Sequence, residues 1–269
     1  MEDVFGPARA RLATLPGEAG AYACDEDGRE LFGEGANELF PSASVIKLPL
    51  VMTLYADAAR GLADLDERVE VGTRVDGSGV LRHMRDAAPM SLRDYAMLAV
   101  IVSDNTATNR LIDRIGTERV NERMREWGCP LSRLERRMYD FEAARAGREN
   151  VMTPRETASL LLRLVRGECE DRATSDAVLA ILAQCQDRTM LRRYLPYTAI
   201  VANKTGTLDE SRNDAAIIRG ERAVVAAAFT KELRDTEAAV SWLGVLGWCA
   251  YRAAGFAGDP LPPELVRTA

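Results

Sequence analysis

Ser44 and Lys47, three positions apart, supply a candidate nucleophile and a candidate base. They stand in Ser44-Val45-Ile46-Lys47, at the start of an apolar stretch. On a helix this spacing puts both side chains on one face, one turn apart. A lysine whose pKa is lowered by burial and by nearby cations can take the proton of a serine hydroxyl. The pattern is short, and roughly one chance match is expected in a chain of this size, so it needs support from other residues.

Lysine is rare in this chain, and its positions give that support. Of the 35 lysines and arginines, only residues 47, 204 and 231 are lysine. Arginine stays protonated in a protein and cannot replace a lysine that acts as a base. Lys204 opens a second short motif, Lys204-Thr205-Gly206. Two of the three lysines therefore lie where a chemical role requires lysine.

Three short motifs follow one another: Ser44-Val45-Ile46-Lys47, Ser103-Asp104-Asn105 and Lys204-Thr205-Gly206. Motifs of this kind occur in class A β-lactamases and penicillin-binding proteins. The sequence resembles the class A β-lactamase family over nearly its whole length, including the flanks at 40–50, 101–111 and 201–207. The resemblance implies a serine β-lactamase/DD-peptidase-like α/β (α+β) fold and a serine hydrolase with an acyl-enzyme intermediate.

The resemblance also implies roles for the motif residues. Ser44 would attack an amide or ester carbonyl, and Lys47 would take its proton directly or through a relay. Ser103 would pass a proton to the leaving nitrogen; the alternative is that Ser103 caps a helix together with Asp104. Lys204 would lower the pKa of Lys47 and of Ser103 while attracting a substrate carboxylate.

Substrate binding is expected around the second and third motifs. Asn105 would donate its amide to a substrate carbonyl, and the resemblance to the family implies that the backbone N–H groups of Ser44 and Thr207 form an oxyanion hole. Gly206 would let the substrate approach the edge strand closely. Arg212, placed just past that strand, either binds the substrate carboxylate or pairs with Asp214 or Asp209 at the surface. The full substrate-binding set is Asn105, Thr205, Gly206, Thr207 and Arg212.

The long loop at 133–150 departs from the family. There the family typically reads R-L-D-R-x-E-P-E-L-N, and its first glutamate activates the water that releases the acyl group. This chain reads R-L-E-R-R-M-Y-D-F-E, and an ungapped alignment puts Met138 in place of that base. Methionine accepts no proton. Asp140 or Glu142 either takes over as the catalytic acid–base group or is a surface acid.

The neck of the same loop also differs. The family's aspartate at this point falls near Asn150. The ion pair that it would make with Arg136 is therefore either lost or taken over by Glu149.

Three functions remain open on this scaffold. The leading one is hydrolysis of β-lactam amides through an acyl-serine intermediate on Ser44. The second is an esterase or D-alanyl-peptidase-like enzyme, for which a β-lactam is a slow substrate or an inhibitor. The third is a penicillin-binding or sensor domain that is acylated once and stays acylated, which Met138 favours.

Strand patterns lie at both ends of the chain. Alternation at 20–24 and at 30–32, around a turn, predicts a hairpin, and further strands are predicted at 199–202, 215–218 and 223–229. We expect one antiparallel sheet built from both chain ends, flanked by helices, with an all-helical insertion. The single domain 1–269 would divide into an α/β subdomain (1–43 and 196–269) and an all-helical subdomain (44–195).

Helices are predicted between these strands. Ser44 opens one that runs to Arg60, and Ser91 caps another that runs to Val102. Residues 133–150 are expected to form a long ordered loop. The remaining helices are predicted at 105–115, 117–127, 153–166, 175–184 and 236–253, the last of them ended by Gly258-Asp259-Pro260.

The composition of the chain limits the classes of molecule that it is expected to bind. A net charge of −6 without a basic cluster argues against nucleic-acid binding. Five widely spaced cysteines and no visible signal peptide predict reduced thiols in a cytoplasmic protein. A single histidine, His83, excludes zinc sites built on several histidines. We expect a small-molecule substrate (a β-lactam, ester or peptide-like compound), no metal, no cofactor and no membrane partner; the oligomeric state is left open.

Overall fold

The computed structural model describes residues 3–256, so the predicted stop at Gly258-Asp259-Pro260 lies outside the described residues. The strands are β1 (Glu18–Asp25), β2 (Glu30–Glu34), β3 (Phe40–Pro41), β4 (Arg68–Val69), β5 (Met90–Ser91), β6 (Val151–Met152), β7 (Ile200–Leu208), β8 (Ser211–Arg219) and β9 (Ala223–Lys231). The helices are α1 (Gly6–Leu12), α2 (Lys47–Ala59), α3 (Leu92–Ile101), α4 (Asn105–Ile115), α5 (Thr117–Glu126), α6 (Phe141–Arg145), α7 (Pro154–Arg166), α8 (Arg172–Leu182) and α9 (Thr236–Ala253), with 3-10 turns η1 (Ala43–Ile46) and η2 (Leu81–His83).

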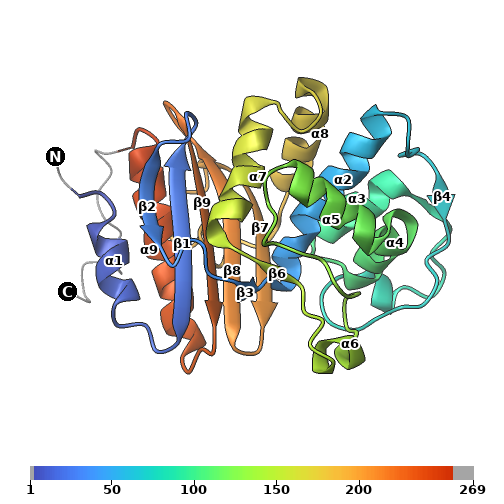
Figure 1. The fold of residues 1–269 in the computed structure, drawn as a ribbon, viewed down its shortest axis with the longest axis horizontal. Helices are drawn as coiled ribbons and strands as arrows, with labels where there is room; N and C mark the ends of the chain where they lie inside the picture. The colour runs from blue at the N-terminus through green and yellow to red at the C-terminus, as the bar shows by residue number, and fades with distance from the viewer. Residues whose placement is uncertain (1–2, 257–269) are drawn as a thin grey trace.

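The main sheet joins the two ends of the chain, as predicted. Its order is β2-β1-β9-β8-β7, and each neighbouring pair is antiparallel. β1 pairs along its whole length with β9, from Glu18 opposite Lys231 to Asp25 opposite Val224. β7, which carries Lys204, is therefore an edge strand, beside the helices at the right of Figure 1.

Both faces of this sheet are buried, which is why its strands are almost continuously apolar. Successive side chains of a strand point to opposite faces. Ala216 and Ile218 of β8 join the core formed with α1 and α9, and Ala215 and Ile217 join the core on the helical side. Helix α7 packs against β1 and β9 although it belongs to the predicted helical insertion (Figure 1).

Helix α2 lies at the centre of the helical part. Every residue from Lys47 to Asp57 is buried, as expected of a helix that is apolar on all sides. It packs against α3, α4, α5 and α8. The catalytic candidates at its N-terminal end are therefore mounted on a rigid element.

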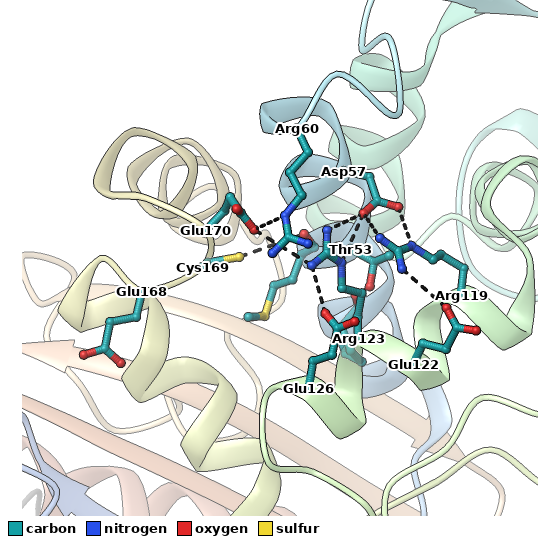
Figure 2. Close-up of polar contacts among 12 residues, drawn as sticks. Thr53, Asp57, Arg60, Arg119, Glu122, Arg123, Glu126, Glu168, Cys169 and Glu170 are labelled. Carbon is teal, nitrogen blue, oxygen red and sulfur yellow. Dashed lines mark hydrogen bonds and ion pairs between the residues drawn. The ribbon is translucent and has the colours of Figure 1, made fainter.

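The other end of α2 is fixed by charge (Figure 2). Asp57 accepts hydrogen bonds from Arg119 (2.8 and 3.0 Å) and from Arg123 (2.6 and 3.1 Å), two arginines of α5. Arg123 is almost fully buried. Arg60 pairs at 2.7 Å with Glu170, which lies between α7 and α8. This cluster ties α2 to two neighbouring segments.

Several features of the helical part differ from the prediction. Ser44 lies in the 3-10 turn η1, and the α-helix begins only at Lys47. α8 begins at Arg172 rather than Ser175, because the Asp171 side chain accepts a hydrogen bond from Thr174 N and caps it. The predicted loop at 133–150 contains the short helix α6.

Candidate active site

Ser44 is presented by a tight turn pressed against the edge strand. The residue before it, Ala43, has a left-handed φ of +48°, and Val45 and Ile46 after it are fully buried. A Cβ atom added at Gly206 would lie 3.0 Å from Ser44 N. Gly206 is thus needed so that the backbone of η1 can touch β7. The group that approaches Gly206 closely is therefore the backbone of the protein itself, whereas we had expected the substrate to lie against this glycine.

Lys47 is fully buried directly beneath this turn. Its Nζ donates to Ser103 O (2.6 Å) and to Asn105 Oδ1 (2.8 Å), and lies 3.1 Å from Ser103 Oγ. Burial lowers the pKa of Lys47 well below its usual value, the charge of Lys204 lowers it further, and Asp104 opposes both. The neutral amine that a proton acceptor requires is therefore favoured here.

The hydroxyl of Ser103 lies between the two lysines. Lys47 Nζ and Lys204 Nζ are each 3.1 Å from Ser103 Oγ. Ser103 has a left-handed φ of +55°, a backbone conformation that is uncommon for residues other than glycine. The helix cap is Asp104 alone, whose side chain accepts from Ala107 N. The alternative prediction, Ser103 as part of the cap, is therefore wrong.

Lys204 is also fully buried, on β7. Its Nζ donates to Thr205 O at 2.7 Å. Burial lowers the pKa of Lys204, while Cys185, Asp214 and Asp187 act in the opposite direction. The prediction put the lysine motif after a strand, but β7 continues through it to Leu208.

Two adjoining hollows meet at Ser44. The smaller, about 340 Å³, includes Ser103, Lys204, Thr205 and Gly206 among its walls. The larger, about 690 Å³, lies toward the long loop and includes Asn105 and Met138. Ser78 and Thr207 line both. A substrate whose carbonyl is at Ser44 would extend into a polar, lysine-bearing side and a roomier side next to the loop.

Asn105 joins the site to the segment at 76–79. Its Oδ1 accepts from Lys47, and its Nδ2 donates to Asp76 O at 3.0 Å. A second Nδ2 hydrogen is left for a substrate carbonyl. Gly77 and Ser78 of this segment line the larger hollow.

The long loop places Met138 in the cleft, as the ungapped alignment predicted. Met138 is largely buried and lines the larger hollow. Its backbone is held by Asn109, one turn after Asn105 on α4. The i, i+4 spacing places both asparagines on one face of α4, which is the signal in the sequence that points to Asn109, although not to its contact with Met138.

Neither loop acid proposed as a replacement base lines a hollow at Ser44. Asp140 caps α6 by accepting from Ala143 N at 2.9 Å. Glu142 is exposed on the same helix. The carboxylate of the long loop that does line the larger hollow is Glu149, which pairs with Arg136 at 2.7 Å. The takeover of the neck ion pair by Glu149 is thereby confirmed.

Arg212 follows β7, as predicted, but it lies within the next strand, which begins before the predicted residue 215. β8 begins at Ser211, and Arg212 pairs with Thr207 across the hairpin. Its guanidinium donates to Leu208 O (2.6 Å) and Ser211 O (2.8 Å), and it lines neither hollow at Ser44. Among the described residues it forms no ion pair with Asp209 or Asp214. Asp214 is instead buried and accepts from Leu191 N and Asn203 Nδ2.

Two further features concern ligands and membranes. Within residues 3–256, no group of three or more histidine, cysteine, aspartate or glutamate side chains is arranged to hold a metal ion. None of the helices in that range is both long enough and apolar enough to cross a bilayer.

Comparison with known sequences points to one family. The model of the β-lactamase enzyme family matches residues 8–254. β-Lactamase L2 of Stenotrophomonas maltophilia is 30% identical over 208 residues, which cover 75% of this chain and 68% of that protein.

Solved structures agree. A β-lactamase from Sphaerobacter thermophilus superposes with a TM-score of 0.85 at 30% identity, covering 97% of this chain and 98% of that one. A variant of PBP-A, solved as an acyl-enzyme complex with penicillin G, superposes with a TM-score of 0.83 at 25% identity, covering 96% and 97%. In that variant a leucine has been changed to glutamate.

Proposed function

The chain belongs to the β-lactamase enzyme family, and we propose that it is a serine hydrolase that opens β-lactam amides by acylation of Ser44. The observation that carries this proposal is the position of Ser103 Oγ, 3.1 Å from both Lys47 Nζ and Lys204 Nζ. A hydroxyl held between two amines of lowered pKa can relay a proton in either direction.

The proposed acylation step uses these groups in order. Ser44 Oγ forms a bond to the lactam carbonyl carbon while its proton moves to Lys47, directly or through a relay. The N–H groups of Ser44 and Thr207 stabilise the negative oxygen. The C–N bond then breaks, and the ring nitrogen receives a proton through Ser103. Lys204 attracts the substrate carboxylate from the smaller hollow.

An intact-mass time course with a penicillin and a cephalosporin tests this proposal. With the penicillin we expect a mass increase of one whole drug molecule, because its ring opening releases no fragment. Ser44→Ala should abolish the adduct. An adduct that still forms on Ser44→Ala would overturn the assignment of the nucleophile.

A second candidate function is carried by Met138. With no proton acceptor at this position, the acyl-enzyme would be released slowly, as in a penicillin-binding or sensor protein or a D-alanyl-peptidase-like enzyme. The likeness to PBP-A supports this reading. An adduct that clears while the drug is consumed favours the β-lactamase; one that persists favours the second function, and turnover of an ester or D-alanyl peptide would then identify it.

We also propose that the protein works in a reducing compartment, the cytoplasm. All five cysteines are buried and unpaired. Cell fractionation with an antibody against the protein tests this location.

A further inference from the structure

The larger hollow combines an aromatic wall with a rim of acids. Tyr139 and Phe141, both from the long loop, stack edge to face with ring centroids 5.1 Å apart. Their side chains remain well exposed, at 43% and 55%. Leu208, on the opposite hairpin, adds a third apolar surface to the same hollow.

Tyr139 is held rigidly in this position. Its φ is +64°, a left-handed conformation that a bulky residue adopts only when its surroundings impose it. The preceding Met138 is clamped by Asn109, and the following Asp140 caps α6. A Cβ atom at Gly77 would lie within 2.7 Å of the Tyr139 ring and hydroxyl. The ring therefore spans from the long loop to the segment at 76–79, beside Asn105.

The charges around the hollow do not cancel. Its two cations are already paired, Arg136 with Glu149 and Lys231 with Glu18. Its other three acids, Asp209, Glu210 and Glu232, are exposed and have no ion-pair partner among the described residues. The nearest further cation on this hairpin, Arg212, keeps its guanidinium on two backbone carbonyls. The hollow thus presents a negative field to an entering group.

We infer that this hollow selects acyl groups that carry an aromatic ring and, next to it, a cationic amine. The ring would pack on Tyr139 and Phe141, and the ammonium would face Asp209, Glu210 and Glu232. The substrate would then be a zwitterion, with its ammonium in the larger hollow and its carboxylate toward Lys204 in the smaller hollow. This inference rests on the proposed function, since it assumes acylation at Ser44.

Three penicillins with one nucleus and one phenyl ring provide the test. They differ only at the side-chain α-carbon, which bears an ammonium in ampicillin, hydrogen in benzylpenicillin and a carboxylate in carbenicillin. We expect second-order acylation rates to fall in that order, by about tenfold from first to last at low ionic strength. The order should largely disappear in 1 M salt, where the Debye length is about 3 Å.

A charge-matched pair of triple variants locates the effect. Asp209→Asn/Glu210→Gln/Glu232→Gln should bring the three rates within about twofold of one another. The control, Asp27→Asn/Glu168→Gln/Glu221→Gln, removes the same charge from exposed acids that line neither hollow at Ser44, and should keep the order. Equal rates for the three drugs on the wild type, or an order that survives in the first variant, would overturn the inference.

The aromatic wall has its own test. The comparison drug is the penicillin that carries an acetyl side chain in place of phenylacetyl and so lacks the ring. Replacing Tyr139 by leucine should reduce the ratio of the acylation rate of benzylpenicillin to that of this analogue by about twofold to tenfold. An unchanged ratio would overturn the aromatic part of the inference. If no penicillin acylates Ser44 at all, the proposed function fails; if all acylate without preference, only this inference fails.

Discussion

Asn109 holds Met138 by two backbone hydrogen bonds: its Oδ1 accepts from Met138 N at 2.8 Å, and its Nδ2 donates to Met138 O at 3.1 Å. Neither bond involves the methionine side chain. The position of residue 138 in the cleft is therefore set by the backbone and does not depend on which side chain stands there. The chain keeps the framework that would carry a deacylating base but has a thioether in its place.

Met138→Glu should consequently speed release of the acyl-enzyme. A carboxylate placed in the hollow with Ser44 can activate water, and a positioned general base is worth about 10²-fold or more. Without further adjustment of its surroundings, we expect the penicillin adduct to clear about 10 to 100 times faster by intact mass. Met138→Gln, which has the same shape without the base, should release the adduct at the wild-type rate. Equal acceleration by both variants would show that polarity alone, and not proton transfer, limits release.

Lys47→Arg should abolish most acylation while keeping the charge. Arginine remains protonated, so the variant loses the base, and the rate should fall by about 10² to 10⁴. Stopped-flow acylation with a reporter cephalosporin measures this, and the melting temperature checks folding. In the wild type the acylation rate should fall as the pH drops below the lowered pKa of Lys47, because the neutral amine is the acting form. A variant that acylates at the wild-type rate would remove Lys47 from the mechanism.

Asp214 should make the free energy of unfolding decrease as the pH rises, which is the opposite of the usual effect of a paired carboxylate. Burial raises its pKa to about 7, against hydrogen bonds from Asn203 and Leu191, while the charge of Asp187 adds to the rise. The folded state then binds more protons than the unfolded state between about pH 4 and 7, so the free energy of unfolding should fall as the pH rises through that window, by roughly 4 kcal/mol at most. Above pH 7 this contribution should level off.

The matched variant for this effect is Asp214→Asn, which cannot ionise. Urea unfolding of both proteins at several pH values between 4 and 8 gives the two curves, and their difference cancels the other titrating groups. We expect the stability of the variant relative to the wild type to increase as the pH rises. Parallel curves would show that Asp214 does not titrate in this range.

The three motifs predicted the fold because each can be read in a short stretch of sequence, and because their order along the chain is specific to one family. Ser44, Lys47, Ser103 and Lys204 each lie in a short segment, and the family that these segments resemble implied the type of fold. Alternation and capping residues predicted the sheet and the helices. The hairpin boundary was missed at Arg212 because the charged residues around Asp209 look like a loop, although β8 begins at Ser211. A strand that ends at a charged hairpin has the same local composition as a loop.

The contacts that the sequence did not reveal are those made with the backbone of a distant segment. The bonds of Asn109 to Met138 and the approach of Ser44 N to Gly206 depend on where two remote segments meet in the fold. Asp140 and Glu142 were credible bases by chemistry alone, and only the course of the loop shows that one caps α6 and the other faces solvent. Residue type narrows the candidates, but the fold decides which of them reach the cleft.

Asp57→Asn should be among the most destabilising single changes in the helical part (Figure 2). Burial raises the pKa of Asp57, but the hydrogen bonds from Arg119 and Arg123 outweigh it, so the pKa lies below its usual value. Removing the carboxylate leaves the buried Arg123 guanidinium with Glu126 at 3.0 Å and Glu170 at 3.8 Å as its remaining counter-charges, so we expect a cost of about 3 kcal/mol, the low end for breaking a buried pair. Glu122→Gln is the control, because Glu122 is half exposed, pairs with Arg119 at 3.4 Å, and should cost no more than about 1 kcal/mol. Urea unfolding at pH 7 measures both. Similar small losses in the two variants would mean that the packing of α2, and not its charge cluster, holds this end of the helix.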